Sequence, residues 1–279
     1  MSLRRETIEL LMRYGIRPRQ DLGQTFLINE SIAKKIVRLA EVKRAKVLEI
    51  GAGLGALTRF LVEEARMVYA VEVDPKLLNI LRSHILPDCS NLVLIGADFL
   101  ELSPPQVDVV VSNMPYSVAT PILFKLLREC SFKRALLTLQ KELALRIMAE
   151  PGSRDYGRLT VSIRAFCEPQ FLMFIGKENF YPIPEVDSAV IKLVRQAPAF
   201  KIEDLNLYLD LARALFTQRN KLLRKALPLS LKGVLKIKIN PSFYEDDAIK
   251  RLMMLRVREL RPEDVALISN VLKRYMEAT

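Results

Sequence analysis

Histidine and cysteine are scarce in this sequence of 279 residues. His84 is the single histidine, which nearly excludes zinc hydrolases, histidine-rich metal sites and most mechanisms with a histidine general base. Cys89, Cys130 and Cys167 are far apart in the sequence, which excludes a disulfide framework and a cysteine zinc cluster. We therefore expect no metal cofactor, and the few cysteines favour a reducing, cytoplasmic location.

Long hydrophobic runs are also lacking. No apolar stretch approaches the roughly 18–20 residues that a membrane span requires, so we expect no membrane partner. The arginines of the first twenty residues are interrupted by Glu6 and Glu9, and no apolar segment follows them, so they do not form a secretory signal. The composition, 50% hydrophobic and 27% charged, is that of an ordinary globular protein and excludes wholesale disorder.

Positive charge is concentrated at the two ends of the chain. The net charge of +11 divides into +6 for residues 1–46, −1 for residues 47–200 and +6 for residues 201–279. Basic flanks around a near-neutral middle are suited to holding a polyanion such as nucleic acid. A solvated surface explains the same charges about equally well, so charge alone suggests this partner without establishing it.

The middle of the chain alternates between strand-like and helix-like segments. We predict strands at Val47–Ile50, Val68–Val73, Leu92–Ile95, Val107–Val111, Ala135–Leu139, Leu159–Phe166 and Ala189–Val194. We predict helices between them at Leu57–Glu64, Lys76–His84, Pro121–Glu129 and Lys141–Ala149. This alternation indicates an α/β fold with a mostly parallel, doubly wound sheet. The last strands have no helices between them, so we expect an antiparallel edge there.

The strand pattern stops near Arg195–Phe200, and only helical patterns follow it. We predict these helices at Leu205–Thr217, Lys221–Leu227, Glu245–Leu252 and Glu263–Tyr275. The sequence therefore predicts two domains. Residues 1–198 would form a basic N-terminal segment and a catalytic α/β domain, and residues 199–279 a small basic helical domain.

A glycine-rich turn follows the first strand of the sheet. In Glu49–Gly55 the glycines allow backbone N–H groups to approach a ligand closely, at the sheet edge where such folds bind ligands. Glu72 ends the next strand, where an acid can bind the hydroxyls of a ribose. The pattern predicts a nucleoside-containing cofactor. Gly51 and Gly53, followed by Ala56, also match the dinucleotide fingerprint, so the glycines alone leave an NAD dehydrogenase open.

Two further motifs follow strands at the same edge. Asp98, which precedes Phe99, is placed to accept from the exocyclic amine of a cofactor's adenine, although an aspartate there is more often a turn residue or a helix cap. Asn113–Tyr116 (Asn-Met-Pro-Tyr) follows a buried strand. Asn113 and the carbonyl of Met114 or Pro115 can both accept hydrogens from one amino group, and Tyr116 offers a ring for stacking. This arrangement suits a flipped-out adenine.

In these and other segments the chain resembles the KsgA-type small-subunit rRNA adenine dimethyltransferases, which are relatives of the erythromycin-resistance rRNA methyltransferases. The resemblance runs from Arg19 to the C-terminus. It is carried by Leu22–Leu27, Glu49–Gly55, Glu72, Asp98, Asn113–Tyr116, Gln140–Glu142, Tyr156–Leu159, Phe180–Ser188 and Phe216–Arg219.

The resemblance implies a Rossmann-like sheet that binds S-adenosylmethionine (SAM) across its strand ends. The implied cofactor-binding residues are Thr25, Leu27, Gly51, Gly53, Glu72, Asp98, Phe99 and Asn113. Glu72 would hold the ribose and Asp98 the adenine of the cofactor, and Tyr116 and Phe180 would sandwich the target adenine. The chain departs from the family at Thr25, where Asn or His is usual, and at Met114, where leucine is common. We expect the second change to be neutral because the backbone carbonyl is the working group there.

The implied reaction is dimethylation of two adjacent adenosines in the 3′-terminal hairpin loop of small-subunit (16S-type) rRNA, as a step in ribosome biogenesis. The substrate would be this rRNA or a pre-30S-type particle. SAM carries a sulfonium leaving group, so positioning of the amine suffices and no strong base is needed, in keeping with a single histidine. We expect Arg219, Lys221, Arg224 and Lys225, on one predicted helix, to contact rRNA phosphates. A solvated helix face is the alternative interpretation of these charges.

Three alternatives remain open from the sequence. One is a noncatalytic rRNA-binding assembly factor on the same fold, and another is a large-subunit rRNA methyltransferase of the resistance type. An NAD dehydrogenase is the third, but it gives no reason for Asn113–Tyr116. The sequence carries no information on oligomeric state, and we assume a monomer.

Overall fold

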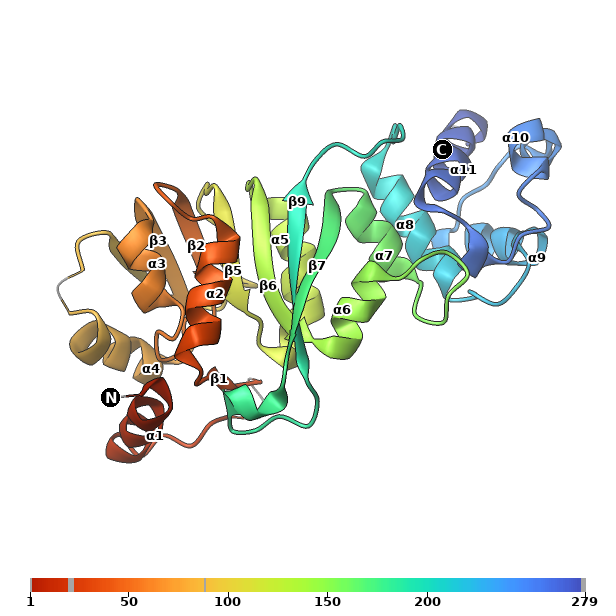
Figure 1. Ribbon diagram of the computed structural model, residues 1–279. Helices are drawn as coiled ribbons and strands as arrows, with labels where there is room; N and C mark the ends of the chain where they lie inside the picture. The colour runs from red at the N-terminus through yellow and green to blue at the C-terminus, as the bar shows by residue number, and fades with distance from the viewer. Residues whose placement is uncertain (1, 20–22, 88, 277–279) are drawn as a thin grey trace. The chain divides into compact units, whose positions relative to one another are not determined.

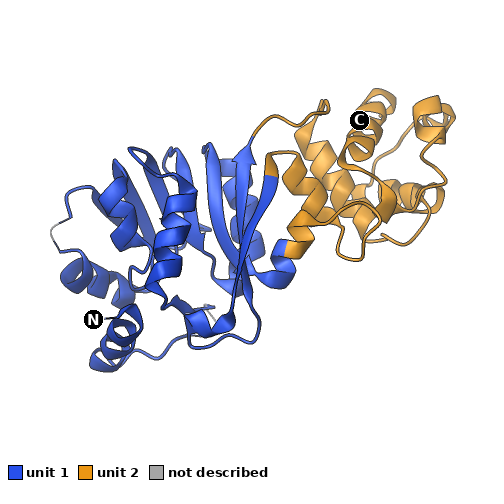
Figure 2. Ribbon diagram, viewed as in Figure 1, with its two compact units in different colours: residues 1–144, 169–195 blue, residues 145–168, 196–279 orange. Residues whose placement is uncertain are grey.

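The computed structural model describes residues 2–19, 23–87 and 89–276, and the chain divides into two compact units. Unit 1 comprises residues 1–144 and 169–195, and unit 2 comprises residues 145–168 and 196–279 (Figure 2). The sequence predicted a single domain boundary after residue 198. The chain does leave unit 1 close to that point, but residues 145–168 also belong to the helical unit. Leu22, part of the first quoted family segment, lies outside the described residues.

Unit 1 is built on a seven-stranded sheet with the strand order β4-β3-β2-β5-β6-β9-β7 (Figure 1). The strands are β2 (Lys46–Ile50), β3 (Met67–Glu72), β4 (Leu92–Gly96), β5 (Val109–Asn113), β6 (Arg134–Gln140), β7 (Cys167–Ile175) and β9 (Ser188–Arg195). Neighbouring strands from β4 to β6 are parallel, whereas β9 runs antiparallel to β6. The predicted parallel sheet with an antiparallel edge is confirmed. Because the central strands are covered on both faces, their apolar side chains are buried almost without alternation.

Helices cover both faces of this sheet. The helices of unit 1 are α1 (Leu3–Arg13), α2 (Glu30–Ala40), α3 (Thr58–Glu64), α4 (Pro75–Ile80) and α5 (Ala119–Glu129), and α6 (Lys141–Met148) begins in unit 1 and ends in unit 2. Helices α2 and α3 pack against each other on one face, and Figure 1 shows α5 on the other. The predictions for α3 to α6 are confirmed. Helices α1 and α2 were not predicted, although Asn29 caps α2 by accepting from the N–H groups of Ser31 and Ile32.

A two-stranded antiparallel ribbon brings distant parts of the sequence together. Strand β1 (Phe26–Leu27) pairs with β8 (Phe180–Tyr181), so that Phe26 lies opposite Tyr181 and Leu27 opposite Phe180. Both Leu27 and Phe180 are buried in the core cluster under the sheet. The ribbon therefore fixes the backbone on either side of it next to the strand ends of unit 1.

Unit 2 is helical, as predicted for the C-terminal part. Its helices are α7 (Arg158–Arg164), α8 (Leu205–Phe216), α9 (Leu223–Leu229), α10 (Asp247–Lys250) and α11 (Pro262–Tyr275). The predicted strand at residues 159–166 is wrong, because this segment is helix α7. Its short apolar run has no periodicity that separates a strand from a buried helix. Helix α7 is instead fixed by tertiary contacts, among them the Tyr208 hydroxyl, which donates to the Val161 carbonyl at 3.0 Å.

Candidate active site

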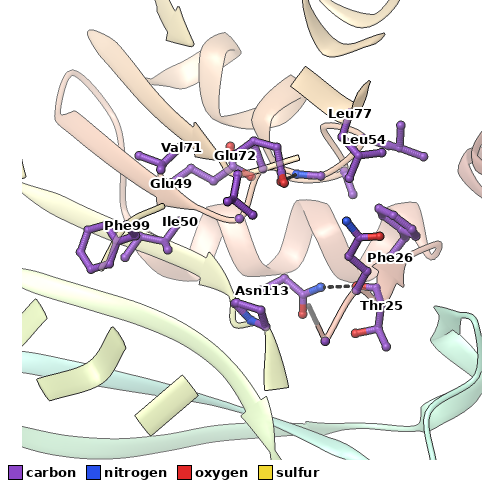
Figure 3. Close-up of a pocket in the computed structure, with 18 of the residues that line it drawn as sticks. Thr25, Phe26, Glu49, Ile50, Leu54, Val71, Glu72, Leu77, Phe99 and Asn113 are labelled. Carbon is purple, nitrogen blue, oxygen red and sulfur yellow. Dashed lines mark hydrogen bonds between the residues drawn. The ribbon is translucent and has the colours of Figure 1, made fainter. Parts of the chain in front are cut away.

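A cavity of about 150 Å³ lies in unit 1 at the carboxyl ends of the parallel strands (Figure 3). All eight residues predicted to bind the cofactor line this cavity. They come from the segment before β1 and from β1, the turn after β2, the end of β3, the segment after β4 and the end of β5: Thr25, Leu27, Gly51, Gly53, Glu72, Asp98, Phe99 and Asn113. Since these strands end at one edge of the sheet, the fold gathers residues that span about a third of the chain.

The glycine turn after β2 needs glycine for its backbone conformation. Gly51, Gly53 and Gly55 have φ values of +76°, +56° and +74°, which side-chain-bearing residues rarely adopt. A Cβ on Gly51 would lie 3.7 Å from the Asn113 carbonyl oxygen and from Pro115 Cδ. Any larger side chain there would therefore extend into the narrow space between the turn and the end of β5.

Two of the carboxyl groups that line the cavity, those of Glu49 and Glu72, are buried (Figure 3). Glu72 accepts from the Gly53 N–H at 2.7 Å and from the Asp74 N–H at 2.9 Å. Burial nevertheless raises the pKa of Glu72 above its ordinary value. Glu49 is only 1% exposed, its Oε2 has no hydrogen-bond partner among the described residues, and burial raises its pKa to about 8. The Glu49 carboxyl is therefore largely neutral at pH 7.

Asn113 ends β5 and is held from one side. Its Nδ2 donates to the Thr25 carbonyl at 2.9 Å, which assigns Oδ1 to the other side of the amide. Oδ1 is buried and accepts no hydrogen bond from any residue that the structure describes. A buried amide oxygen without a donor costs free energy unless a ligand supplies one. The amide is thus fixed in place with a vacant acceptor at the cavity.

The residues after Asn113 are ordered by the neighbouring strand. Met114 is completely buried, and its N–H donates to the Thr138 carbonyl on β6 at 3.0 Å. The Pro115 carbonyl accepts from the Val118 N–H at 3.3 Å, so this carbonyl already has a donor. A carbonyl oxygen has two lone pairs, so the carbonyls of both Met114 and Pro115 remain candidates for a substrate contact. Of these two residues, only Pro115 lines the cavity.

The two aromatic residues predicted to stack on the target base lie in different environments. Tyr116 is half-buried, and its hydroxyl is hydrogen-bonded to Ser188 Oγ at 2.6 Å. Burial raises the pKa of the Tyr116 phenol, so the ring is neutral. Phe180 is 0% exposed and lies in the core cluster with Leu27 and Ile175. In this structure Phe180 anchors β8, and the predicted stacking of its ring on the target adenine would require the ring to leave the core.

Sequence reasoning missed the contribution of the N-terminal helix. Thr7 of α1 lines the cavity, and Leu10 and Leu11 pack on Leu54 and Leu77, which also line it. No motif marked α1 as part of a site. The amphipathic spacing of its leucines was the one available signal, and it indicates a buried helix face without saying what lies beneath it.

The four basic residues predicted to contact RNA do not share one helix. Gln218–Lys221 form a turn between α8 and α9, and α9 starts only at Leu223. Arg219 donates through Nη2 to the carbonyls of Ser153 and Arg154, so it is a structural residue of unit 2. The prediction placing it on a phosphate-contacting helix is corrected. Lys221, Arg224 and Lys225 are exposed.

The sequence disfavoured metal enzymes and membrane proteins. No group of three or more potential metal ligands occurs among residues 2–19, 23–87 and 89–276. Within the same described residues, no helix has the length and apolar character needed to cross a membrane. His84, predicted to end a helix, lies in a π-helical turn (Leu81–Ile85), where the Tyr14 hydroxyl is within 2.6 Å of its Nε2.

Residues 15–264 match the family model for ribosomal RNA adenine dimethylase. The chain belongs to this family. Relatives of similar length include the probable ribosomal RNA small subunit methyltransferases A of Methanosarcina mazei and Thermococcus onnurineus. The first is 39% identical over 94% of this chain and 96% of its own length. The second is 40% identical over 97% of this chain and 98% of its own length. The resemblance stated from the sequence is confirmed.

Solved structures agree with this assignment. A dimethyladenosine transferase from Plasmodium falciparum matches with a TM-score of 0.73 and 26% identity, over 86% of this chain and 94% of its own. The 23S rRNA methyltransferase ErmE matches with a TM-score of 0.67 and 28% identity, over 89% and 99%. The predicted Rossmann-like methyltransferase fold with a helical C-terminal part is confirmed.

Proposed function

We propose that this protein dimethylates the exocyclic amines of two adjacent adenosines in the 3′-terminal hairpin loop of small-subunit rRNA, with SAM as the methyl donor. Family membership supports adenine dimethylation of rRNA, and the names of the most similar relatives favour the small subunit. The single observation that supports catalysis by this chain is the vacant, buried Oδ1 of Asn113 at the cofactor-type cavity.

The cavity suits SAM by its donors, acceptors and shape. Glu72 is proposed to accept from the ribose hydroxyls, because each carboxylate oxygen keeps a second lone pair beside its backbone bond. Asp98 is exposed at the cavity and is proposed to accept from the adenine amine. Phe99 and Ile50 lie together at one end of the cavity, where an adenine ring can pack (Figure 3). Bound there, SAM supplies an electrophilic methyl group on a sulfonium leaving group.

The residues after β5 are proposed to position the nucleophile. Asn113 Oδ1 and the carbonyl of Met114 or Pro115 accept the two hydrogens of the target amine, which draws its nitrogen toward a pyramidal geometry. The Tyr116 ring stacks on the adenine, and the Tyr116–Ser188 hydrogen bond fixes that ring. These fixed acceptors lower the barrier by positioning and electrostatics, so no basic side chain has to remove a proton before methyl transfer. The second transfer starts from an amine with one hydrogen and needs space for a methyl group beside Asn113.

The basic residues of unit 2 are proposed to hold the RNA backbone. Lys221, Arg224 and Lys225 are exposed and lie within six residues of the end of the Phe216–Arg219 family segment. Exposed lysine and arginine side chains position a nucleic acid through its phosphates without reading its sequence. Arg219 supports them indirectly by tying its turn to the Ser153 and Arg154 carbonyls.

The test is to incubate the protein with labelled SAM and unmethylated small and large ribosomal subunits, and to map the modified positions. We expect dimethyladenosine at two adjacent positions of the small-subunit 3′ hairpin. Asn113→Ala should lower single-turnover methyl transfer by two or more orders of magnitude, by analogy with an oxyanion-hole donor worth roughly 2.7–4 kcal/mol, while rRNA affinity changes little.

Asn91→Ala is the matched control for this variant. Asn91 is also a partly buried amide of unit 1, but it bonds the Val62 and Ala65 carbonyls and does not line the cavity. Its loss should lower the melting temperature and leave the activity of the folded protein intact. Full turnover by a folded Asn113→Ala protein would refute the catalytic role, and label only in the large subunit would refute the substrate.

A further inference from the structure

Two phenylalanine rings are exposed side by side on β7, the strand at one edge of the sheet. Phe171 is 42% exposed and Phe174 is 53% exposed. Their ring centroids lie 4.7 Å apart with an angle of 53° between the planes. Single exposed apolar residues are normal on a protein surface, but a contacting pair of ordered aromatic rings is a feature of binding surfaces.

A cation accompanies these rings. Lys141, the exposed first residue of α6, places its Nζ 5.1 Å from the centroid of the Phe174 ring. In the loop before β9, Asp187 Oδ1 accepts from the Lys177 N–H at 3.1 Å. Aromatic faces next to a lysine are the combination with which proteins bind single-stranded nucleic acid, because bases stack on the rings and the cation attracts the phosphates.

Short contacts within unit 1 link this surface to the proposed catalytic residues. The Tyr116 hydroxyl is bonded to Ser188, and Ser188 is paired with Gln140 across β6 and β9. Lys141 follows Gln140, and its N–H donates to the Asp187 carbonyl at 2.9 Å. Three strand spacings separate β5 from β7, which is about 14 Å. At roughly 3.4 Å per nucleotide along one strand, about four nucleotides span this distance, so one RNA loop can reach both places.

We propose that Phe171, Phe174 and Lys141 form a stacking platform for an unpaired base of the substrate RNA, a loop nucleotide near the target adenosine. The platform would hold the loop open while the target base occupies the site beside Tyr116. This proposal rests on the proposed function for its RNA substrate. It adds a second base-binding place, which neither the glycine turn nor the Asn113 segment supplies.

The experiment uses hairpins with the 3′-terminal loop sequence of small-subunit rRNA, each carrying one abasic loop nucleotide. Their affinities are measured by fluorescence anisotropy for the wild type, a Phe171→Leu/Phe174→Leu variant and a Phe171→Tyr/Phe174→Tyr variant. In the wild type, one abasic position besides the target should weaken binding about fivefold or more. The leucine variant should bind the intact hairpin as weakly as the wild type binds that abasic hairpin, because leucine keeps apolar area but offers no ring to stack on. For the same reason, an abasic nucleotide at that position should not weaken its binding further. The tyrosine variant should behave as the wild type.

Two controls separate the possible outcomes. Val93→Ala alters an exposed apolar residue on β4, the opposite edge of the sheet, and should leave RNA binding unchanged. Asn113→Ala should lose methyl transfer, but the abasic nucleotide should still weaken its hairpin binding as it does for the wild type. Failure of catalysis and failure of the platform are therefore distinguishable. The platform is refuted if the leucine variant binds every hairpin as the wild type does. It is also refuted if sedimentation shows that the wild type is a dimer that the leucine variant dissociates, since β7 would then join two copies.

Discussion

At the scale of single residues, the cavity is lined by two buried acids whose environments differ. Glu72 has a backbone donor on each oxygen, whereas Glu49 keeps one buried oxygen without a partner among the described residues. The charge of Glu72 adds to the effect of burial on the pKa of Glu49, while Thr58 partly offsets it by hydrogen bonding. The result is one acid whose two oxygens are both held by backbone donors and one carboxyl that is largely neutral at pH 7.

Glu49→Gln should therefore change how stability depends on pH. The pKa of Glu49 rises from 4.5 in the unfolded chain to about 8 in the fold, so the folded state binds more protons between these values. The free energy of unfolding must then fall as pH rises from about 4.5 to 8, with no further change from this group above that range. Glutamine cannot ionise, so the melting temperature of the variant should fall less than that of the wild type when the pH is raised from 6 to 9. Parallel melting curves would contradict the raised pKa.

Tyr116→Ala and Phe180→Ala should have opposite effects. Phe180 is completely buried, and removing it should cost about 3–5 kcal/mol of stability, as core phenylalanines do. Tyr116 is half-buried at the site, and its loss should lower methyl transfer by the equivalent of roughly 1–3 kcal/mol with a smaller change in melting temperature. Thermal unfolding and single-turnover transfer measured on both variants check this. A stable Phe180→Ala protein with greatly reduced activity would restore the stacking role for Phe180.

At the scale of elements, α1 closes one side of the cavity. Its leucines pack on the glycine turn and on α4, and Glu6 forms an ion pair with Arg59 of α3 at 2.8 Å. The ion pair is partly exposed and contributes little by itself. The apolar contacts therefore hold the helix in place, and with it Thr7 at the cavity.

Leu11→Ala should loosen α1 and weaken SAM binding. Leu11 is 4% exposed, and a buried Leu→Ala change costs about 2–5 kcal/mol, which is enough to release a helix at the end of the chain. Met12→Ala is the matched control, because Met12 lies next to Leu11 but is 73% exposed. Calorimetric titration with SAM compares the two variants with the wild type. Equal affinities for all three proteins would mean that α1 is no part of the cofactor site.

The sequence predicted elements best where periodicity is strong and contacts are local. The central strands are continuous apolar runs, so β2 to β6 were identified to within about two residues at each end. The β1–β8 ribbon could not be predicted, because two-residue strands have no period and their partners are about 150 residues apart. Helix α7 was read as a strand since its β-branched residues favour strands, while its helical state depends on packing within unit 2.

The site residues that the sequence brings together are those whose positions depend on the order of the strands. Residues that follow parallel strands, such as Gly51, Glu72 and Asn113, meet at one edge whatever the details of packing, so topology alone predicts their proximity. Burial does not follow from topology. The accessibility of Phe180 and the backbone contacts of Arg219 depend on neighbours far along the chain, which a single sequence does not reveal.

At the scale of the whole molecule, charge is divided between the ends and the middle of the chain. The described residues that line the cavity include the acids Glu49, Glu72 and Asp98 and no lysine or arginine. The surplus of positive charge lies in the first 46 and last 79 residues of the sequence. The charge inside the cavity therefore favours a cationic ligand, and the surplus outside it favours a polyanion.

Reversing charge at Lys221, Arg224 and Lys225 should weaken RNA binding and flatten its dependence on salt. A phosphate that no side chain neutralises keeps its counterion. Each phosphate contact that is lost therefore reduces the slope of the logarithm of the RNA-binding constant against log salt by about 0.7–0.9. SAM affinity should not change, because none of the three residues lines the cavity. Reversal of Lys232, Lys236 and Lys238, which are exposed in the same unit, makes the same change in net charge and serves as the control. If both triple variants reduce the slope equally, RNA responds to the general field of unit 2. A larger reduction at residues 221–225 would support direct phosphate contacts there.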